Sequence, residues 1–210
     1  MTTPVSIVLM DDPALNTAAR TLARHQYGLL TSQQCQEHGV TSSVAERRVR
    51  TGRWRRPTRG VVDVGAIPAA SLAPDVRHRR AAVLAFLAFG TDVVAVGPSA
   101  LALLGVWGLP RIVSPQCALL GADRRRSRNG LRCRRFEVDA ETAGVDGFVV
   151  VEPVLALAQA IVEVSPRTAL GLIDSALHRG VIRAEQVSVV RDRARGRRSA
   201  PPSPRPGSSW

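Results

Sequence analysis

Residues 28–65 read GLLTSQQCQEHGVTSSVAERRVRTGRWRRPTRGVVDVG, and this stretch decides the fold that we expect for the N-terminal part of the chain. Thr31 and Gln34 have the spacing of a capping box, which predicts the start of a short helix. Gly39 is the residue type that ends a helix in the left-handed conformation. Only two residues then precede a further helix, so the pattern predicts a helix-turn-helix.

The further helix has two different faces. Any of the hydroxyl residues 41–43 is a suitable cap, and Ser43 with Glu46 has the form of a second capping box. At about 100° per residue, the inward face consists of Val44, Ala45 and Val49. The outward face consists of Ser43, Glu46, Arg47 and Arg50. Arg48 falls toward the apolar side, where we expect its stem to be packed.

The outward face has the chemistry of a DNA-reading helix. A recognition helix places its N-terminal residues against base edges in the major groove, and an arginine there donates two hydrogen bonds to guanine. Arg47 and Arg50 are therefore the candidate base readers, with the small hydroxyl of Ser43 beside them near the start of the helix.

A β-hairpin is expected directly after this helix, because Gly52 ends the helix and a short β-branched strand follows from Gly60. Trp54 is a large apolar anchor, and we expect the turn at residues 57–59. A hairpin in this position is a wing, which contacts phosphates or the minor groove. Its candidate phosphate-binding residues are Arg53, Arg55, Arg56 and Arg59.

The whole chain is expected to be α+β, with a winged helix-turn-helix over residues 1–65 and a small mixed α/β domain over 76–195. Between them, residues 66–75 are small, contain proline and read as a linker. The Arg/Pro/Ser tail of residues 196–210 is expected to be disordered.

Within the second domain, hydrophobic patterns predict both helices and strands. The expected strands are 115–121, 131–138 and 147–153, and Asn129-Gly130 is expected to close a hairpin between the first two. The expected helices are 76–90, one opened by Ser99, 154–164, one capped by Ser165 with Pro166 in its first turn, and 184–195.

The charge favours a nucleic-acid partner. All 29 basic residues are arginine against 17 acids, which gives a net charge of +12 and a pI near 11.5. Since the chain has no lysine, a P-loop lysine and a Schiff-base lysine are excluded. The arginines concentrate in two clusters, at residues 41–60 and at Arg124–Arg135. The second cluster either follows phosphates beside the first or, as we favour, is a solvated hairpin that contacts an acidic partner.

No cofactor or metal site is expected. The three cysteines and four histidines have no metal-ligand spacing, and unpaired cysteines favour a reducing, cytoplasmic location. The uncharged run of residues 93–110 is long enough for a membrane span, but Pro98 and three glycines interrupt it, so two buried elements are favoured. The N-terminus lacks the basic and apolar regions of a signal peptide.

Catalysis is not expected either. Glu137, Asp139 and Glu141 alternate and would share one face of an extended segment, but no histidine supports a metal site there. Asp174 lies on an apolar helix, where pairing with an arginine is the simpler interpretation. The chain contains no GxSxG elbow, GxGxxG loop or P-loop.

The run over about residues 28–65 resembles the N-terminal winged-helix domain of AbiEi-type antitoxins of type IV toxin–antitoxin systems, in its actinobacterial form. The resemblance implies binding to double-stranded DNA at the protein's own promoter and autorepression of a toxin–antitoxin operon. It also implies a nucleotidyltransferase-like toxin as partner of the second domain. The residues to which the DNA-binding role carries over are Ser42, Ser43, Arg47, Arg50, Arg53, Arg55, Arg56 and Arg59.

Many actinobacterial relatives carry a further domain that resembles very-short-patch-repair endonucleases, and it is not expected in these 210 residues. The expected function is therefore that of a non-enzymatic transcriptional autorepressor and antitoxin. The alternatives are a non-catalytic protein-interaction module, in which the arginine face binds an acidic protein surface, and a truncated remnant of a nuclease-domain protein.

Overall fold

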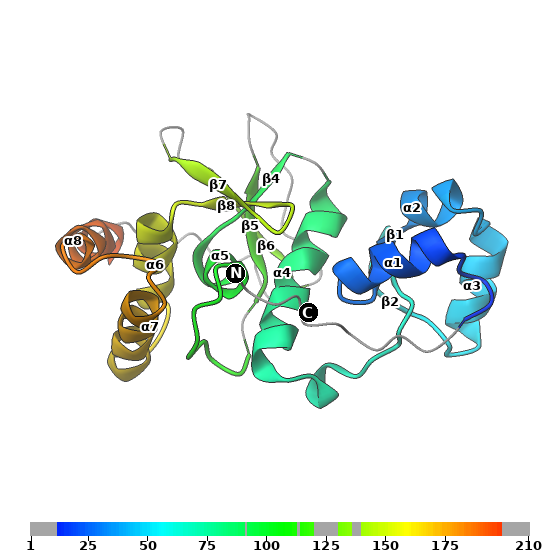
Figure 1. Cartoon of the computed structure of the whole chain (residues 1–210), viewed down its shortest axis with the longest axis horizontal. Helices are drawn as coiled ribbons and strands as arrows, with labels where there is room; N and C mark the ends of the chain where they lie inside the picture. The colour runs from blue at the N-terminus through cyan, green and yellow to red at the C-terminus, as the bar shows by residue number, and fades with distance from the viewer. Residues whose placement is uncertain (1–11, 91, 113, 120–129, 136–139, 199–210) are drawn as a thin grey trace, which may run out of the picture.

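The computed structural model describes residues 12–90, 92–112, 114–119, 130–135 and 140–198, and within these it has the expected α+β architecture (Figure 1). The described residues form eight α-helices, a three-stranded antiparallel sheet and a five-stranded mixed sheet. We refer to residues 12–65 as the N-terminal unit and to residues 66–198 as the C-terminal unit.

The N-terminal unit contains three helices and the small sheet. Its elements in chain order are α1 (Thr17–His25), β1 (Leu29–Thr31), α2 (Ser32–Glu37), α3 (Ser42–Arg50), β2 (Arg55–Thr58) and β3 (Val61–Asp63). The strands lie in the order β1-β3-β2, so the hairpin of β2 and β3 is extended by the strand that precedes α2. β1, which is only three residues long, was not predicted from the sequence.

Local capping explains where the short helices begin. Thr31 and Gln34 form the predicted capping box, with each side chain accepting from the other residue's backbone N–H. Of the three hydroxyl residues considered for α3, Thr41 is the cap, and it accepts from the backbone N–H of Val44. Gly39 has the predicted left-handed conformation, with φ at +82°.

The turn of the hairpin differs from the prediction. Pro57 and Thr58 belong to β2, and the turn consists of Arg59 and Gly60 alone, because Thr58 is paired with Val61. A proline is tolerated here since β2 is an edge strand whose outer N–H groups need no partner. The two-residue loop also uses the positive φ of Gly60, at +80°.

The five-stranded sheet belongs to the C-terminal unit. Its strands are β4 (Val93–Ala95), β5 (Gln116–Leu119), β6 (Arg132–Arg135), β7 (Thr142–Val145) and β8 (Phe148–Val151), in the order β6-β5-β4-β8-β7. The predicted hairpin between β5 and β6 is wrong, because these strands are parallel. Parallel neighbours need a crossover connection of about a dozen residues, and the stretch between Leu119 and Arg132 has that length.

Two further strands were not predicted. β4 lies in the uncharged run of residues 93–110, where it is followed by α5 (Gly97–Leu103). β7 forms a hairpin with β8 through Asp146 and Gly147, which both have positive φ. Asp-Gly is a strong hairpin signal, so this turn was recognisable in the sequence.

The remaining helices are α4 (Pro74–Phe89), α6 (Pro153–Ile161), α7 (Pro166–His178) and α8 (Gln186–Arg198). Of these, α4 contacts β4 and β5 of the larger sheet, whereas α7 and α8 contact α6, which itself lies against α5 (Figure 1). Ser165 caps α7 as predicted, but Ser99 lies inside α5, where its hydroxyl accepts from the backbone N–H of Gln116. α8 continues to residue 198, three residues into the expected tail; residues 199–210 lie outside the described part. None of the described helices combines the length and apolar character needed to cross a bilayer.

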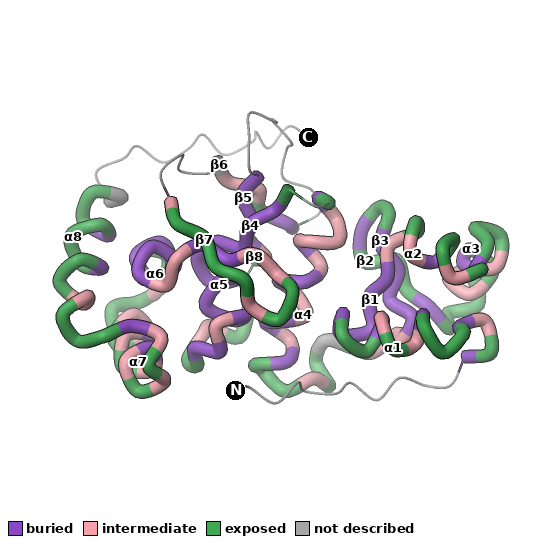
Figure 2. The backbone as a smooth tube through the Cα atoms, turned by 45° about the horizontal axis from the view of Figure 1, so that its top comes forward, coloured by how far each residue is buried: buried purple, intermediate pink, exposed green. Residues whose placement is uncertain are grey.

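The small sheet has a different core on each of its faces. Leu30, Val62 and Trp54 belong to a cluster inside the N-terminal unit. Leu29 and Val61 instead join the core of the C-terminal unit, together with Val76 of α4. α4 therefore lies against the small sheet as well as the large one, and Figure 2 shows the buried residues concentrated in the sheets and in α5 and α6. Within the expected linker, residues 66–75, Ile67 and Leu72 pack on this core, and a 3₁₀ turn spans Ala69–Ser71.

Candidate nucleic-acid interface

α3 has the two faces that its sequence predicts. Ala45 is buried and Val44 and Val49 are half-buried against the core of the N-terminal unit. The candidate residues on the opposite face are all exposed, and they are Ser42, Ser43, Arg47 and Arg50. Glu46 is exposed on the same face, so it is the acidic side chain nearest to these arginines along the helix.

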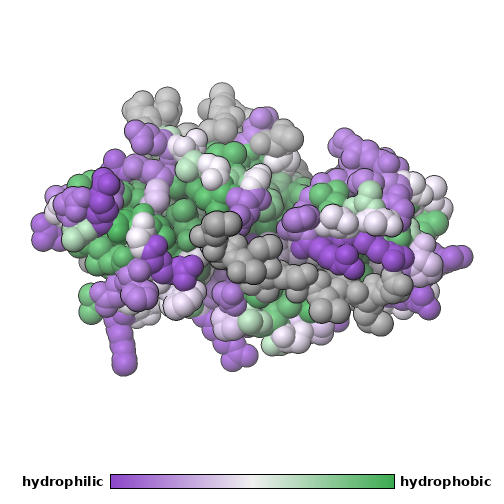
Figure 3. Space-filling view, viewed as in Figure 1, coloured by the Kyte–Doolittle hydropathy of each residue, from purple (hydrophilic) through white to green (hydrophobic). Residues whose placement is uncertain are grey.

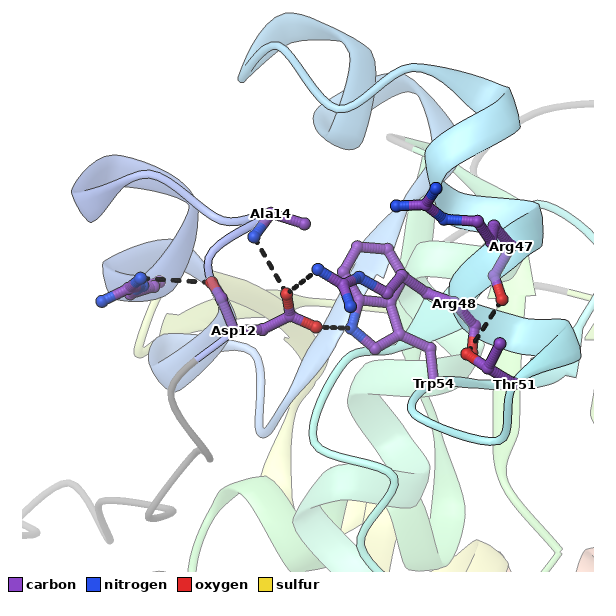
Figure 4. A network of polar contacts seen from close by, with 7 residues as sticks. Asp12, Ala14, Arg47, Arg48, Thr51 and Trp54 are labelled. Carbon is purple, nitrogen blue, oxygen red and sulfur yellow. Dashed lines mark hydrogen bonds and ion pairs between the residues drawn. The ribbon is translucent and has the colours of Figure 1, made fainter.

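The orientation of α3 is fixed by a buried carboxylate that the sequence analysis did not identify (Figure 4). Asp12 accepts a hydrogen bond of 3.0 Å from the indole N–H of Trp54. Its other oxygen forms an ion pair of 2.8 Å with Arg48 and accepts from the backbone N–H of Ala14. One side chain thus ties the start of α1 to α3 and to the residue that precedes β2.

The same contacts explain why neighbouring arginines on α3 differ. Arg48 is turned inward, as predicted, and its side chain is only 14% exposed. The guanidinium of Arg47 lies apart from the Asp12 carboxylate (Figure 4). At the end of the helix, the Thr51 hydroxyl donates to the carbonyl of Arg47, which closes the last turn. Arg47 therefore keeps its charged end for contacts outside the unit.

The hydroxyls at the start of α3 take part in local contacts. The Ser42 hydroxyl accepts a hydrogen bond of 3.3 Å from the Gln36 side-chain amide of α2. The Ser43 and Thr41 hydroxyls lie 3.0 Å apart. These contacts fix the turn between α2 and α3, and each hydroxyl keeps hydrogen-bonding capacity toward solvent.

The hairpin presents its arginines on both faces of the small sheet. All four candidates, Arg53, Arg55, Arg56 and Arg59, are exposed. In the strand register Arg55 lies opposite Asp63, so the two side chains point to the same face of the sheet. This is the face that α4 covers, where Arg80 forms an ion pair with Asp63. Arg56 instead lines a recess of about 140 Å³ together with Ser42, Ala45 and Glu46 of α3. The structure therefore brings Arg56 next to the start of α3, whereas Arg55 belongs to the opposite face.

None of the six exposed arginines has an acidic partner in the part of the chain that the structure describes. The ion pairs among these residues do not include Arg47, Arg50, Arg53, Arg55, Arg56 or Arg59. In Figure 3, hydrophilic residues gather over the N-terminal unit, on the right of the view. The exposed surfaces of α3 and the hairpin thus carry positive charges that no acid among the described residues neutralises.

The second arginine cluster is arranged differently where it is described. Arg132 and Arg134 of β6 both form ion pairs with Glu163, just after α6. Arg124, Arg125, Arg126 and Arg128 lie outside the described residues. Arg132 and Arg134 are therefore both paired with a carboxylate of the same chain.

The described candidates for catalysis, Glu141 and Asp174, are not brought together. Glu137 and Asp139 lie outside the described residues. Glu141, just before β7, and Asp174, in α7, are both exposed. No group of three His, Cys, Asp or Glu side chains suited to a metal ion occurs among the described residues.

The two buried thiols, Cys35 and Cys117, have no feature of a reactive site. Burial raises the pKa of Cys35 to about 11. Burial, with smaller contributions from the charge and hydrogen bond of Cys133, raises the pKa of Cys117 to about 12. Both thiols are therefore protonated and poorly nucleophilic at neutral pH.

Comparison with protein-family models, with curated proteins and with solved structures gives no match for this chain. Its function must therefore be inferred from the geometry and charge of its own residues.

Proposed function

We propose that residues 12–65 are a winged helix-turn-helix that binds duplex DNA, with α3 in the major groove and the β2–β3 hairpin as the wing. The observation that carries the proposal is the set of exposed arginines without internal partners on α3 and the hairpin, beside an inward-turned Arg48. The element order α1-β1-α2-α3-β2-β3 supports it, since a wing directly follows the recognition helix.

In this proposal Arg47 and Arg50 contact base edges. Phosphates are neutralised by Arg53, Arg56 and Arg59, and Arg55, on the opposite face of the hairpin, attracts the duplex at longer range. The two roles differ in their consequences, because base contacts specify sequence whereas phosphate contacts set affinity and orientation. Arg56 lies beside the start of α3, so it is placed to hold the strand that flanks the groove. The contacts of Asp12 with Trp54 and Arg48 contribute by fixing the orientation of α3 relative to the wing.

We further propose that the chain acts as a repressor at its own promoter and as the antitoxin of a toxin–antitoxin pair, with a mixed α/β C-terminal domain that binds a nucleotidyltransferase-like toxin. This more specific role rests on the resemblance of residues 28–65 to AbiEi-type antitoxins. The mechanism is occlusion of the promoter and requires no catalytic group.

The test is fluorescence anisotropy of the full chain with a duplex from upstream of its own gene and with a scrambled duplex. We expect tighter binding to the first duplex. With roughly five to seven phosphate contacts, affinity should fall by about three orders of magnitude between about 50 and 200 mM salt. Absence of binding at low salt would sink the proposal and favour a protein-interaction module, and metal-dependent cleavage of the duplex would favour a nuclease remnant.

A further inference from the structure

The arginine cluster at residues 41–60 contains a single acid, Glu46, beside seven arginines. Glu46 lies in α3 and is exposed. Its carboxylate weakens the attraction of the cluster for DNA, because like charges repel and each phosphate is negative. In the proposed complex α3 lies in the major groove, so this repulsion is offset only by a favourable contact of the carboxylate in the groove.

Glu46 lies in the middle of the outward face of α3. At about 100° per residue, it is displaced by about 40° from Ser42 on one side and from Arg50 on the other. The three residues therefore form one row along the helix, spaced four residues apart. Ser42 and Arg50 are both exposed candidates for DNA binding. Glu46 thus faces the same side as the residues that are proposed to contact the duplex.

The carboxylate of Glu46 forms no ion pair with another side chain in the described ranges of the chain. Arg50 follows it by four residues, a spacing at which an acid and an arginine commonly pair. Arg56 lines the same recess of about 140 Å³, and it too lies beyond ion-pair distance. Both carboxylate oxygens therefore remain available as acceptors for an external donor.

The bases differ in what they present to a carboxylate in the major groove. Cytosine presents the donor N4 amino group, whereas guanine presents only the acceptors O6 and N7, and thymine presents the acceptor O4. Adenine presents its amino group beside the acceptor N7. An acceptor-only side chain therefore favours cytosine, and it is repelled by guanine and thymine at the same position.

We propose that Glu46 is a further base-reading residue, whose carboxylate accepts a hydrogen bond from the N4 amino group of a cytosine in the major groove. Residues four apart in a helix are about 6 Å apart along its axis, and base pairs are about 3.4 Å apart. The base pair contacted by Arg50 should therefore lie one or two steps from this cytosine. The inference rests on the proposed function of residues 12–65 and adds to it the base that the acid selects.

The first test is selection of duplexes from a randomised library by the full chain and by three variants. The unaltered chain should select a cytosine one or two positions from a guanine. Glu46→Ala should lose the cytosine preference and keep the guanine preference. Glu46→Gln should shift the preference toward adenine, because a glutamine amide matches the N6 and N7 atoms of adenine. Glu37→Ala, which removes an exposed acid from α2, is the matched control and should leave the base preferences unchanged.

Anisotropy titrations then separate a base contact from mere repulsion of phosphates. Glu46→Ala should bind the selected duplex about tenfold or more weakly, since a hydrogen bond to a charged acceptor is lost. On a duplex with a thymine·adenine pair in place of the cytosine·guanine pair, the same variant should bind at least as tightly as the unaltered chain.

Two results would overturn the inference while leaving the proposed function intact. One is an equal gain in affinity of Glu46→Ala on both duplexes, which would show that the carboxylate only repels phosphates. The other is a selected sequence whose base preferences are the same in the unaltered chain and in Glu46→Ala. Absence of DNA binding by the unaltered chain would instead contradict the proposed function, and this inference with it.

Discussion

In the N-terminal unit, six arginines on α3 and the hairpin are exposed and have no acidic partner among the described residues. In the C-terminal unit, several arginines are turned inward: Arg80 pairs with Asp63, Arg134 with Glu163, and Arg79 is buried. Both units are basic in sequence, so net charge does not distinguish them. The location of the carboxylates distinguishes the two units, because an arginine that is paired with an acid of the same chain is not available to an external partner.

The largest effect should come from removing the Asp12 carboxylate, which pairs with Arg48 of α3 but not with Arg47. We expect Asp12→Ala to lower the free energy of unfolding by about 3–5 kcal/mol, because it leaves the Arg48 charge buried and unpaired. Urea unfolding followed by tryptophan fluorescence measures it. Glu46→Ala, which removes an exposed acid from the same unit, is the control and should change stability by about 0.5 kcal/mol or less. Similar losses in both variants would mean that Asp12 does not fix α3.

A smaller effect is expected on sequence preference. Arg47→Ala should reduce the difference in binding free energy between the cognate and scrambled duplexes by about 1–3 kcal/mol, because a base contact is lost. Its neighbour Arg48 faces inward, so Arg47 is the residue of this pair that carries the preference. Anisotropy titrations on both duplexes measure it, and an equal loss on the two would reassign Arg47 to phosphate binding.

A still smaller effect is expected on the overall affinity for DNA, and the two faces of the hairpin provide a matched pair of variants to measure it. Arg56→Gln should weaken binding to both duplexes by about tenfold, since Arg56 lies beside the start of α3 and its charge-assisted hydrogen bond to a phosphate is lost. Arg55→Gln removes the same charge from the opposite face and should change affinity by about twofold, through a long-range attraction that salt screens. Equal losses would show that the wing does not approach DNA by the face that we propose.

The smallest effect concerns the stability of the C-terminal unit at acid pH. Burial lowers the pKa of His78 below its ordinary value of 6.5, which outweighs the opposing hydrogen bond to the Pro110 carbonyl. The unfolded chain therefore takes up a proton near pH 6.5 that the folded chain does not, so stability should fall as the pH drops below 6.5. Thermal unfolding across this range measures the change, and His78→Gln should flatten it. An equal flattening in His178→Gln, an exposed histidine on α7, would contradict the assignment.

Sequence patterns predicted the features of this fold that depend on nearby residues. The Thr31–Gln34 capping box, the Gly39 turn and the Ser165 cap each need partners within a few positions, and all three are present. The two faces of α3 were predictable for the same reason, because helical periodicity is local.

Features that depend on distant partners were not predictable. β5 and β6 pair in parallel, and Glu163, which lies far along the chain from both, contacts Gln116 of β5 and Arg132 and Arg134 of β6. Asp12 followed by Pro13 is typical of a turn that starts a segment, and the Asp12 side chain does accept from the backbone of Ala14. Nothing near it in the sequence points to Trp54, so its contacts with Trp54 and Arg48 were not predictable.

The contact between Asp12 and Trp54 also has a consequence for the order of folding. These residues are 42 positions apart, so their hydrogen bond can form only after a long loop has closed. The chain loses conformational entropy in that closure before the hydrogen bond contributes any stability. The backbone hydrogen bonds and caps of the helices between them join nearby residues and can form sooner. Refolding should therefore show helical circular dichroism before the environment of Trp54 becomes native, and the guanidinium-bearing surface of α3 acquires its final orientation in the later step.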